Sequence, residues 1–279
     1  MQTAAPSVSY TGASVPSGRH ACPHPSARPG LAAARPLRAA AAAGLAASLV
    51  LLAGCGSGGG DAKATAAPVP TATADGFGCL SPEQAKAHSV TFPSGTGQDV
   101  EAFATGTGTT ALVLMHQAES DVCQWVPKAV DLAADGYRVV AVNSAGSEVA
   151  EVTAAVAYAR SEGAAKVLLV GASKGGTAVL SAAGSITPRV DAVVALSAPS
   201  VYTGMDASLV VPGLTMPVLY MASEYDSPFA QSARELSKAT TKAPEDDLTI
   251  VDGMNHGVGM LDSDANYAKV KGFLKKYGG

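Results

Sequence analysis

The sequence predicts an α/β domain over residues 77–279, with a mostly parallel central sheet and helices on both of its faces. Apolar runs alternate with amphipathic patterns along this region, which indicates repeated strand–helix units. Most of these runs are continuously apolar, as is typical of strands buried on both faces of a parallel sheet. With 279 residues and 47% hydrophobic content, the chain can form one large domain or two small ones.

The elements follow in order along the chain. Residues 89–95 and 99–106 read as a β-hairpin, with Gly95 and Gly97 in its turn. Further strands are expected at 110–116, 137–144, 166–171, 191–199, 216–223 and 247–253. Helices are expected at 125–136, 147–163, 174–184, 229–240 and 264–278. In the second of these helices, Ser147 is a candidate N-cap and Gly163 a candidate terminator.

Residues 1–54 have the composition of an export signal. They contain four arginines and no Asp or Glu, although the whole chain has a formal net charge of −4. Arg35 and Arg38 precede an apolar run that ends in "LLAGC" at Cys55, which resembles the lipobox of bacterial lipoproteins. The resemblance implies cleavage before Cys55, a diacylglycerol on its thiol, and a lipid-anchored protein outside the cytoplasmic membrane. An ordinary secretory signal with a chance cysteine is the alternative.

Residues 55–76 read as a flexible tether, because Gly, Ala, Thr and Pro recur there without periodicity. The chain has no basic run or stripe, so a nucleic-acid partner is not expected. The sequence leaves the oligomeric state open.

The chain contains four cysteines. If Cys22 belongs to the leader and Cys55 is lipidated, Cys79 and Cys123 are the available disulfide pair in a compartment that permits disulfides. Two unpaired thiols are the alternative. No Cys-x-x-Cys motif and no Cys/His cluster occurs, so neither a metal site nor a cofactor is expected.

A serine between two glycines is the first candidate for chemistry. Ser173 lies in the pattern Gly171-x-Ser173-x-Gly175, directly after an expected strand and before an expected helix. Functional groups in open parallel sheets gather at the carboxyl ends of strands, and glycines permit a tight turn that exposes the hydroxyl. The alternative is a small polar residue in an ordinary turn.

A serine nucleophile needs a base and an acid that orients the base. Three histidines follow the leader, of which His88 precedes the hairpin and His116 is expected to be a structural residue beneath the site. His256 follows the last strand, where it can reach over the serine. Glu224 and Asp226, both after strand 216–223, are the candidate acids.

The order Ser173, Asp226, His256, each after a strand, resembles the α/β-hydrolase fold over roughly residues 85–279. Residues 223–226 match the family's Gly-x-x-Asp pattern with Ser in place of Gly, which favours Asp226 over Glu224. The triplet "NHG" around His256 resembles the family's histidine loop. The short spacings are similar to those of the compact dienelactone-hydrolase branch, which has a cysteine nucleophile where this chain has Ser173.

The resemblance also implies an oxyanion hole built from two backbone N–H groups, here those of Gln117 and Lys174. His116-Gln117 departs from the His-Gly that families often show at this position. The Lys174 side chain is expected to be solvated at a helix start, with binding of an acidic substrate group as the alternative.

The connection between the strands at 191–199 and 216–223 is short, so a small lid or no lid is expected there. Candidate site-lining residues are Tyr202, Met205 and Leu209, for which a place over the core is the alternative, and candidate rim residues are Gln124 and Trp125. The sequence therefore predicts a lipid-anchored serine hydrolase that cleaves small or medium carboxylic esters through an acyl-enzyme. An acyltransferase acting on cell-envelope components and a non-catalytic binding lipoprotein are the alternatives.

Overall fold

The computed structural model describes residues 76–146 and 148–279. The predicted leader (1–54), the lipidation site Cys55, the tether up to residue 75 and the candidate cap Ser147 lie outside the described residues.

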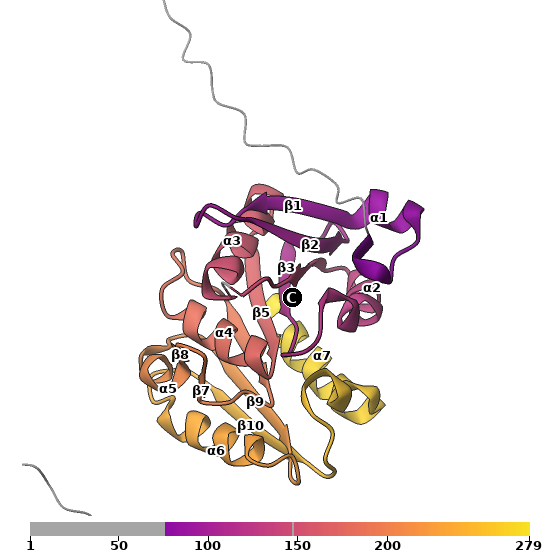
Figure 1. Ribbon diagram of the computed structural model, residues 1–279. Helices are drawn as coiled ribbons and strands as arrows, with labels where there is room; N and C mark the ends of the chain where they lie inside the picture. The colour runs from indigo at the N-terminus through magenta and orange to yellow at the C-terminus, as the bar shows by residue number, and fades with distance from the viewer. Residues whose placement is uncertain (1–75, 147) are drawn as a thin grey trace, which may run out of the picture. The chain divides into compact units, whose positions relative to one another are not determined.

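An eight-stranded sheet forms the centre of the domain (Figure 1). In spatial order its strands are β1 (Ser89–Pro93), β2 (Asp99–Thr105), β4 (Arg138–Asn143), β3 (Thr110–Met115), β5 (Lys166–Ala172), β6 (Ala192–Leu196), β9 (Val218–Ser223) and β10 (Asp246–Val251). Strand β2 runs antiparallel to both of its neighbours, and all other neighbouring pairs are parallel. The predicted mostly parallel sheet is confirmed.

Helices cover both faces of this sheet, as predicted. They are α2 (Val126–Ala134), α3 (Glu148–Ser161), α4 (Lys174–Ala183), α6 (Phe229–Ala239) and α7 (Asp264–Gly278). Successive residues of a strand point to opposite faces. In β3, Val113 and Met115 therefore join a first core cluster with α3, α4 and α6. Leu112 and Leu114 join a second core cluster with α2 and α7.

The predicted hairpin is present, with Ser89 opposite Phe103 and Pro93 opposite Asp99. Gly95 and Gly97 lie in its turn with φ of +79° and +93°. Residues with a β-carbon rarely adopt this backbone region, so the turn depends on glycine.

A short helix before the hairpin was not predicted. Helix α1 (Pro82–His88) begins with a capping box, in which the Ser81 side chain accepts a hydrogen bond from the Gln84 N–H at 3.2 Å. In return, the Ser81 N–H donates to Gln84 Oε1 at 2.9 Å. Ser-x-x-Gln with a proline directly after the serine, at the first helical position, is a recognisable helix start, so the signal was present in the sequence.

The chain before α1 is tied to the region after β3 by a disulfide. Cys79 and Cys123 are bonded, with their Cα atoms 5.9 Å apart. The bond joins the residue directly after the turn η1 (Gly76–Gly78) to the turn η2 (Val122–Gln124). Trp125, which follows η2, is only 1% exposed and belongs to the second core cluster. The prediction that it lines the rim of the site is wrong, because its ring packs into the core.

The connection from β6 to β9 contains only short elements. It contains the antiparallel strands β7 (Val201–Tyr202) and β8 (Met205–Asp206), the single-turn helix α5 (Ala207–Val210) and the turn η3 (Val211–Gly213). Met205 is buried in the first core cluster, whereas Leu209 is 79% exposed. A large lid is therefore absent from this part of the described chain.

Within residues 76–146 and 148–279, no helix combines the length and apolar character needed to cross a bilayer. The same residues contain no group of three or more His, Cys, Asp or Glu placed to hold a metal ion.

Candidate active site

Ser173 occupies a sharp turn between β5 and α4. Its backbone has φ +50° and ψ −119°, a conformation that is rare for a residue with a side chain. The Ser173 N–H donates to the Leu196 carbonyl at 2.8 Å, which extends the pairing of β5 with β6 by one residue. Strained backbone of this kind clusters at functional sites, where surrounding structure holds it in place.

The glycines on either side of Ser173 are required by close backbone packing. A β-carbon on Gly171 would lie 2.1 Å from the Gly175 carbonyl oxygen. One on Gly175 would lie 2.4 Å from the Met115 carbonyl oxygen, at the end of β3. The Gly-x-Ser-x-Gly pattern therefore reflects a turn that packs directly against the neighbouring strand end.

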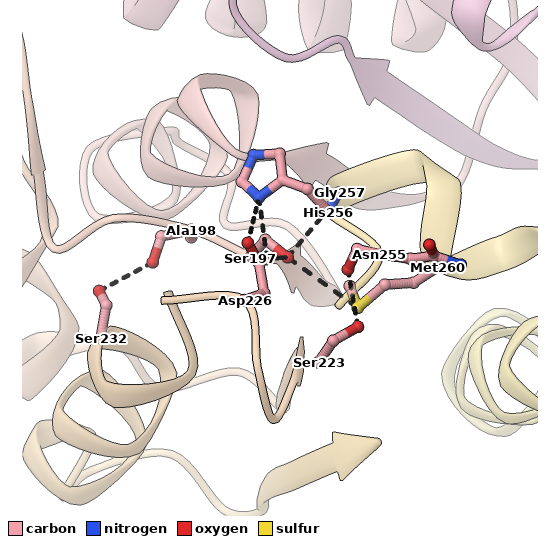
Figure 2. A network of polar contacts seen from close by, with 9 residues as sticks. All are labelled: Ser197, Ala198, Ser223, Asp226, Ser232, Asn255, His256, Gly257 and Met260. Atoms are coloured by element: carbon pink, nitrogen blue, oxygen red, sulfur yellow. Dashed lines mark hydrogen bonds and ion pairs between the residues drawn. The ribbon is translucent and has the colours of Figure 1, made fainter. Parts of the chain in front are cut away.

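The loops after β9 and β10 bring an acid and a base together. His256 Nδ1 lies 2.8 Å from Asp226 Oδ2 and 3.1 Å from Asp226 Oδ1 (Figure 2). The Asp226 residue is 8% exposed, so its interaction with the ring is largely protected from water. The other candidate acid, Glu224, is instead near Arg234, with 3.9 Å between the charged groups. The structure thus places Asp226, and not Glu224, on the imidazole.

The loop that carries His256 packs against the turn that carries Ser173 and against the loop after β3. A β-carbon on Gly257 would lie 3.3 Å from the Ala172 β-carbon and 2.4 Å from Gln117 Oε1. On its other side, the His256 ring contacts Phe229, with 4.3 Å between the ring centres. Across the described residues, no hydrogen bond joins the Ser173 hydroxyl to the imidazole. Such contacts are often long in the absence of substrate and tighten when it binds.

Comparisons with known proteins identify the architecture. No family model matches the sequence, and no curated protein matches it. Solved structures do match, among them an esterase of Pyrococcus furiosus with a TM-score of 0.61 and 13% identity, covering 68% of this chain and 90% of that one. The chain has the α/β-hydrolase fold.

Two further solved structures have the same architecture. The esterase domain of a Rhodothermus marinus protein has a TM-score of 0.57 and 19% identity, and covers 68% of this chain and 98% of that one. Dienelactone hydrolase from Anabaena variabilis has a TM-score of 0.55 and 15% identity, with coverage of 68% and 95%. The predicted similarity to this fold, including its dienelactone-hydrolase branch, is confirmed at the level of architecture.

In this α/β-hydrolase fold, four adjacent parallel strands carry the polar groups of the candidate site. Strands β5, β6, β9 and β10 are neighbours in that order. Ser173 follows β5, Asp226 follows β9 and His256 follows β10. Their carboxyl ends lie along one edge of the sheet, which is where open α/β sheets bind ligands.

Ser197, which follows β6, is a member of this group that the sequence analysis missed. It is 0% exposed and has a φ of +47°. Its hydroxyl donates to Asp226 Oδ2 at 2.7 Å and accepts a hydrogen bond from the Gly257 N–H at 3.0 Å (Figure 2). The available signal was its place at a strand end, but the sequence analysis included it in strand 191–199.

A second serine hydroxyl fastens the histidine loop. Ser223, at the end of β9, donates to the Asn255 carbonyl at 2.6 Å, one residue before His256 (Figure 2). Ser223 stands where the family pattern has glycine. In this chain the Ser223 side chain links the end of β9, which precedes Asp226, to the loop that carries His256.

The two residues expected to form the oxyanion hole lie at different strand ends: Gln117 is in the loop after β3, and Lys174 begins helix α4 after β5. Lys174 is the first residue of α4, and N–H groups in a first helical turn have no partner within the helix. The Gln117 N–H donates to Gln124 Oε1, but at 3.4 Å this is a long hydrogen bond. Both donors are therefore free or only weakly engaged within the described structure.

His116 has a structural role beneath this loop. It is 2% exposed, its Nδ1 donates to the Gln117 carbonyl at 2.8 Å, and its Nε2 accepts a hydrogen bond from the Ser144 N–H at 3.0 Å. Both ring nitrogens are thus occupied by backbone groups, and burial lowers the pKa of the ring. His88 is also held by backbone, with its Nδ1 3.0 Å from the Ala104 carbonyl, beside the hairpin.

The expectation of a solvated Lys174 side chain is wrong. Its Nζ lies 3.4 Å from Glu148 Oε1, and the two side chains are only 12% and 15% exposed. The charge at this flank of the site is therefore paired with the start of α3. The pairing leaves the Lys174 backbone N–H unaffected.

Proposed function

We propose that this protein is a serine hydrolase that cleaves carboxylic esters of small-molecule substrates. The observation that carries the proposal is the Asp226–His256 hydrogen bond, which forms at the same sheet edge as the strained Ser173 turn. A carboxylate that orients an imidazole beside a serine is the arrangement that activates a weak hydroxyl nucleophile.

The proposed reaction has two halves. His256 Nε2 takes the proton from Ser173 Oγ as that oxygen attacks the ester carbonyl, and Asp226 stabilises the resulting imidazolium. The tetrahedral intermediate collapses, the C–O bond to the alcohol breaks, and His256 returns the proton to the departing alcohol oxygen. Water, deprotonated by His256, then attacks the acyl carbon, the bond from that carbon to Ser173 Oγ breaks, and His256 returns the proton to Oγ as the acid departs.

Two backbone donors are proposed to stabilise the oxyanion. The Lys174 N–H points from the start of a helix, whose positive dipole end favours negative charge. The Gln117 N–H would exchange its long bond to Gln124 Oε1 for a shorter bond to the negatively charged oxygen. Preorganised donors of this kind are commonly worth about 3–4 kcal/mol of barrier each.

Substitution of the proposed nucleophile tests this function. Ser173→Ala should lower kcat on p-nitrophenyl acetate by about 10⁴-fold or more, because no other group can form the acyl-enzyme. It should also abolish covalent labelling by a fluorophosphonate probe. Circular dichroism and urea denaturation serve as the control for folding. A folded variant that keeps its turnover or its labelling would refute the assignment.

The short connection between β6 and β9 supports a preference for esters with short acyl chains. Because no large lid covers the strand ends there, the proposed site suits esters with short or medium acyl chains. In the same assay, p-nitrophenyl butyrate should therefore be turned over more efficiently than the palmitate ester.

We also infer that the protein is anchored through a lipid on Cys55, outside the cytoplasmic membrane. The support is the "LLAGC" sequence behind an arginine-rich, acid-free leader. Multiple acyl chains give stable membrane attachment, whereas a single chain does not. In a bacterial host, Cys55→Ser should move the protein from the membrane fraction to the soluble fraction, as followed by immunoblotting. Equal membrane association of both forms would exclude the anchor.

A further inference from the structure

We propose that Ser197 is a positioning residue of this site, whose hydroxyl holds the Asp226 carboxylate and the peptide after His256 in the geometry that the base requires. This inference rests on the proposed serine-hydrolase function. It assigns a role to a buried side chain that lies outside the predicted Ser-His-Asp set.

Strand β6 lies between the strand of the nucleophile and the strand of the acid. At its end, the Leu196 carbonyl accepts from the Ser173 N–H at 2.8 Å, and the Ser197 N–H donates to the Met221 carbonyl at 2.8 Å. Two adjacent residues therefore connect to β5 on one side and to β9 on the other. The backbone that carries the Ser197 hydroxyl is therefore held by hydrogen bonds to both neighbouring strands.

The hydrogen-bonding capacity of the hydroxyl matches its surroundings. A serine hydroxyl has one proton to donate and two lone pairs that accept. The Gly257 N–H, 3.0 Å away, uses a lone pair, and Asp226 Oδ2, 2.7 Å away, takes the proton. The Met260 sulfur at 3.9 Å is a far weaker acceptor than a carboxylate and does not compete for the proton. Since Ser197 is 0% exposed, water cannot readily replace these bonds.

The first consequence concerns the acid. Asp226 Oδ2 accepts from both Ser197 Oγ and His256 Nδ1, at 2.7 and 2.8 Å. Terminal rotation of an aspartate is broad and roughly two-fold, so a single donor would leave the carboxylate free to turn. The second donor fixes which oxygen faces the ring and in which plane it lies.

The second consequence concerns the base. The Gly257 peptide N–H follows His256 directly, so its bond to Ser197 fixes the backbone that carries the imidazole. Gly257 has a φ of +55° and lies close to the Gln117 side chain, so the backbone of this loop has few other conformations that would fit. One hydroxyl therefore holds both partners of the Asp226–His256 pair relative to each other.

The backbone of Ser197 adds to the argument. Its φ of +47° is unfavourable for a residue with a β-carbon, and glycine would adopt it without strain. A strained conformation at a buried position next to an acid–base pair is the kind of outlier that points to function.

The first test measures Ser197→Ala on p-nitrophenyl acetate. We expect kcat to fall about 10- to 100-fold with KM little changed, since misplacing a catalytic group by a small distance has effects of this size. Ser197→Gly removes the same hydroxyl but relieves the backbone strain, so it should lose kcat to a similar extent. Recovery of kcat in Ser197→Gly would show that backbone geometry, and not the hydroxyl, is what matters.

A matched control lies nearby. Ser232 is also buried, at 8% exposure, and its hydroxyl donates to the Ala198 carbonyl at 2.8 Å, one residue from Ser197 (Figure 2). Among the described residues, no hydrogen bond joins the Ser232 side chain to Asp226 or His256. Ser232→Ala should leave kcat unchanged, and the proton resonance of His256 Nδ1 should move in Ser197→Ala but not in Ser232→Ala. A shift in neither variant would overturn the proposal.

A double-mutant cycle with Asp226→Asn gives the decisive result. Because Ser197 is proposed to act partly through Asp226, Ser197→Ala should cost clearly less kcat in the Asp226→Asn background than in the wild type, and the loss that remains is assigned to its bond with the Gly257 N–H. Fully additive losses would reject the positioning role while leaving the triad intact. If Asp226→Asn alone kept the wild-type kcat, the proposed function itself would fail, so the two failures are distinguishable.

Discussion

His116 and His256 have the same side chain but differ in what their ring nitrogens contact. Both nitrogens of His116 bind backbone groups, which fixes it as a neutral ring under the Gln117 peptide. His256 instead directs Nδ1 to a carboxylate and is partly open to solvent, with 28% of its side chain exposed. The surroundings thus hold one ring entirely through backbone groups and place the other between a buried carboxylate and solvent.

The burial of His116 predicts an acid-sensitive contribution to stability. Burial lowers its pKa below the ordinary value of 6.5, so below that pH the unfolded chain binds a proton that the folded chain does not. The unfolding free energy should therefore fall as the pH decreases from about 6.5 toward the lowered pKa of the folded state. Urea denaturation at pH 7.5 and pH 5 measures this loss.

The matched comparison is His116→Gln, which removes the titrating ring. This variant should be less stable than the wild type at pH 7.5, because it loses backbone hydrogen bonds. Its further loss between pH 7.5 and pH 5 should be smaller than that of the wild type. Equal losses in the two proteins would contradict the assigned role of burial.

At the scale of elements, the turn between β5 and α4 depends on Gly175. In Gly175→Ala, the new β-carbon would lie 2.4 Å and 2.7 Å from the carbonyl oxygens of Met115 and His116. These are backbone atoms at a strand end and cannot move cheaply, so we expect a loss of about 2–3 kcal/mol in unfolding free energy. Urea denaturation gives the value.

Gly272, within α7, provides the control for this substitution. Apart from its chain neighbours and the nearby backbone of its own helix, no atom lies within 4 Å of a β-carbon placed there, so Gly272→Ala meets no obstacle from packing. Alanine is the better helix former, and the variant should gain about 0.5–1 kcal/mol. Opposite signs are therefore expected for two Gly→Ala changes, and a loss of similar size at both would contradict the packing argument.

Periodicity predicted most of the elements, and their order indicated the residues of the candidate site. The predicted strand at 166–171 and the helix at 174–184 differ from β5 and α4 by one residue at one end. Ser173, Asp226 and His256 then followed from strand-end positions. Ser197 did not follow, because its hydroxyl reaches Asp226 only through a positive φ that residue type does not reveal. The Lys174–Glu148 pair likewise depends on how α3 and α4 pack together.

At the scale of the whole domain, the sheet order explains how distant segments form one site. Strands β5, β6, β9 and β10 are adjacent, so four successive loops meet at one edge although their residues are spread over more than eighty positions. Each loop is fixed to its neighbour by a hydrogen bond. These are Ser173 to Leu196, Ser197 to Asp226, and Ser223 to Asn255. The four loops of the candidate site are therefore joined to one another by hydrogen bonds at the edge of the sheet.

The disulfide should contribute substantially to the stability of this domain. Cys79 and Cys123 are 44 positions apart, and closing a loop of that size in the unfolded chain is worth about 4 kcal/mol on the chain-entropy model. The double variant Cys79→Ala/Cys123→Ala should unfold at correspondingly lower urea concentration. Adding a thiol reductant should destabilise the wild type and leave the double variant unaffected. Equal stability of the two proteins without reductant would contradict this estimate.

The same bond also decides how the domain bears tension. Strands β1, β2 and β3 all lie between Cys79 and Cys123, whereas the shortest covalent path between these residues crosses the two sulfur atoms. A pull on the two ends of the domain therefore passes from Cys79 directly to Cys123. The intervening segment, roughly 150 Å long if fully extended, cannot be drawn out while the bond is intact. The edge hairpin therefore lies outside the loaded path, which on the N-terminal side enters the fold at η2, just before α2, and on the C-terminal side at α7.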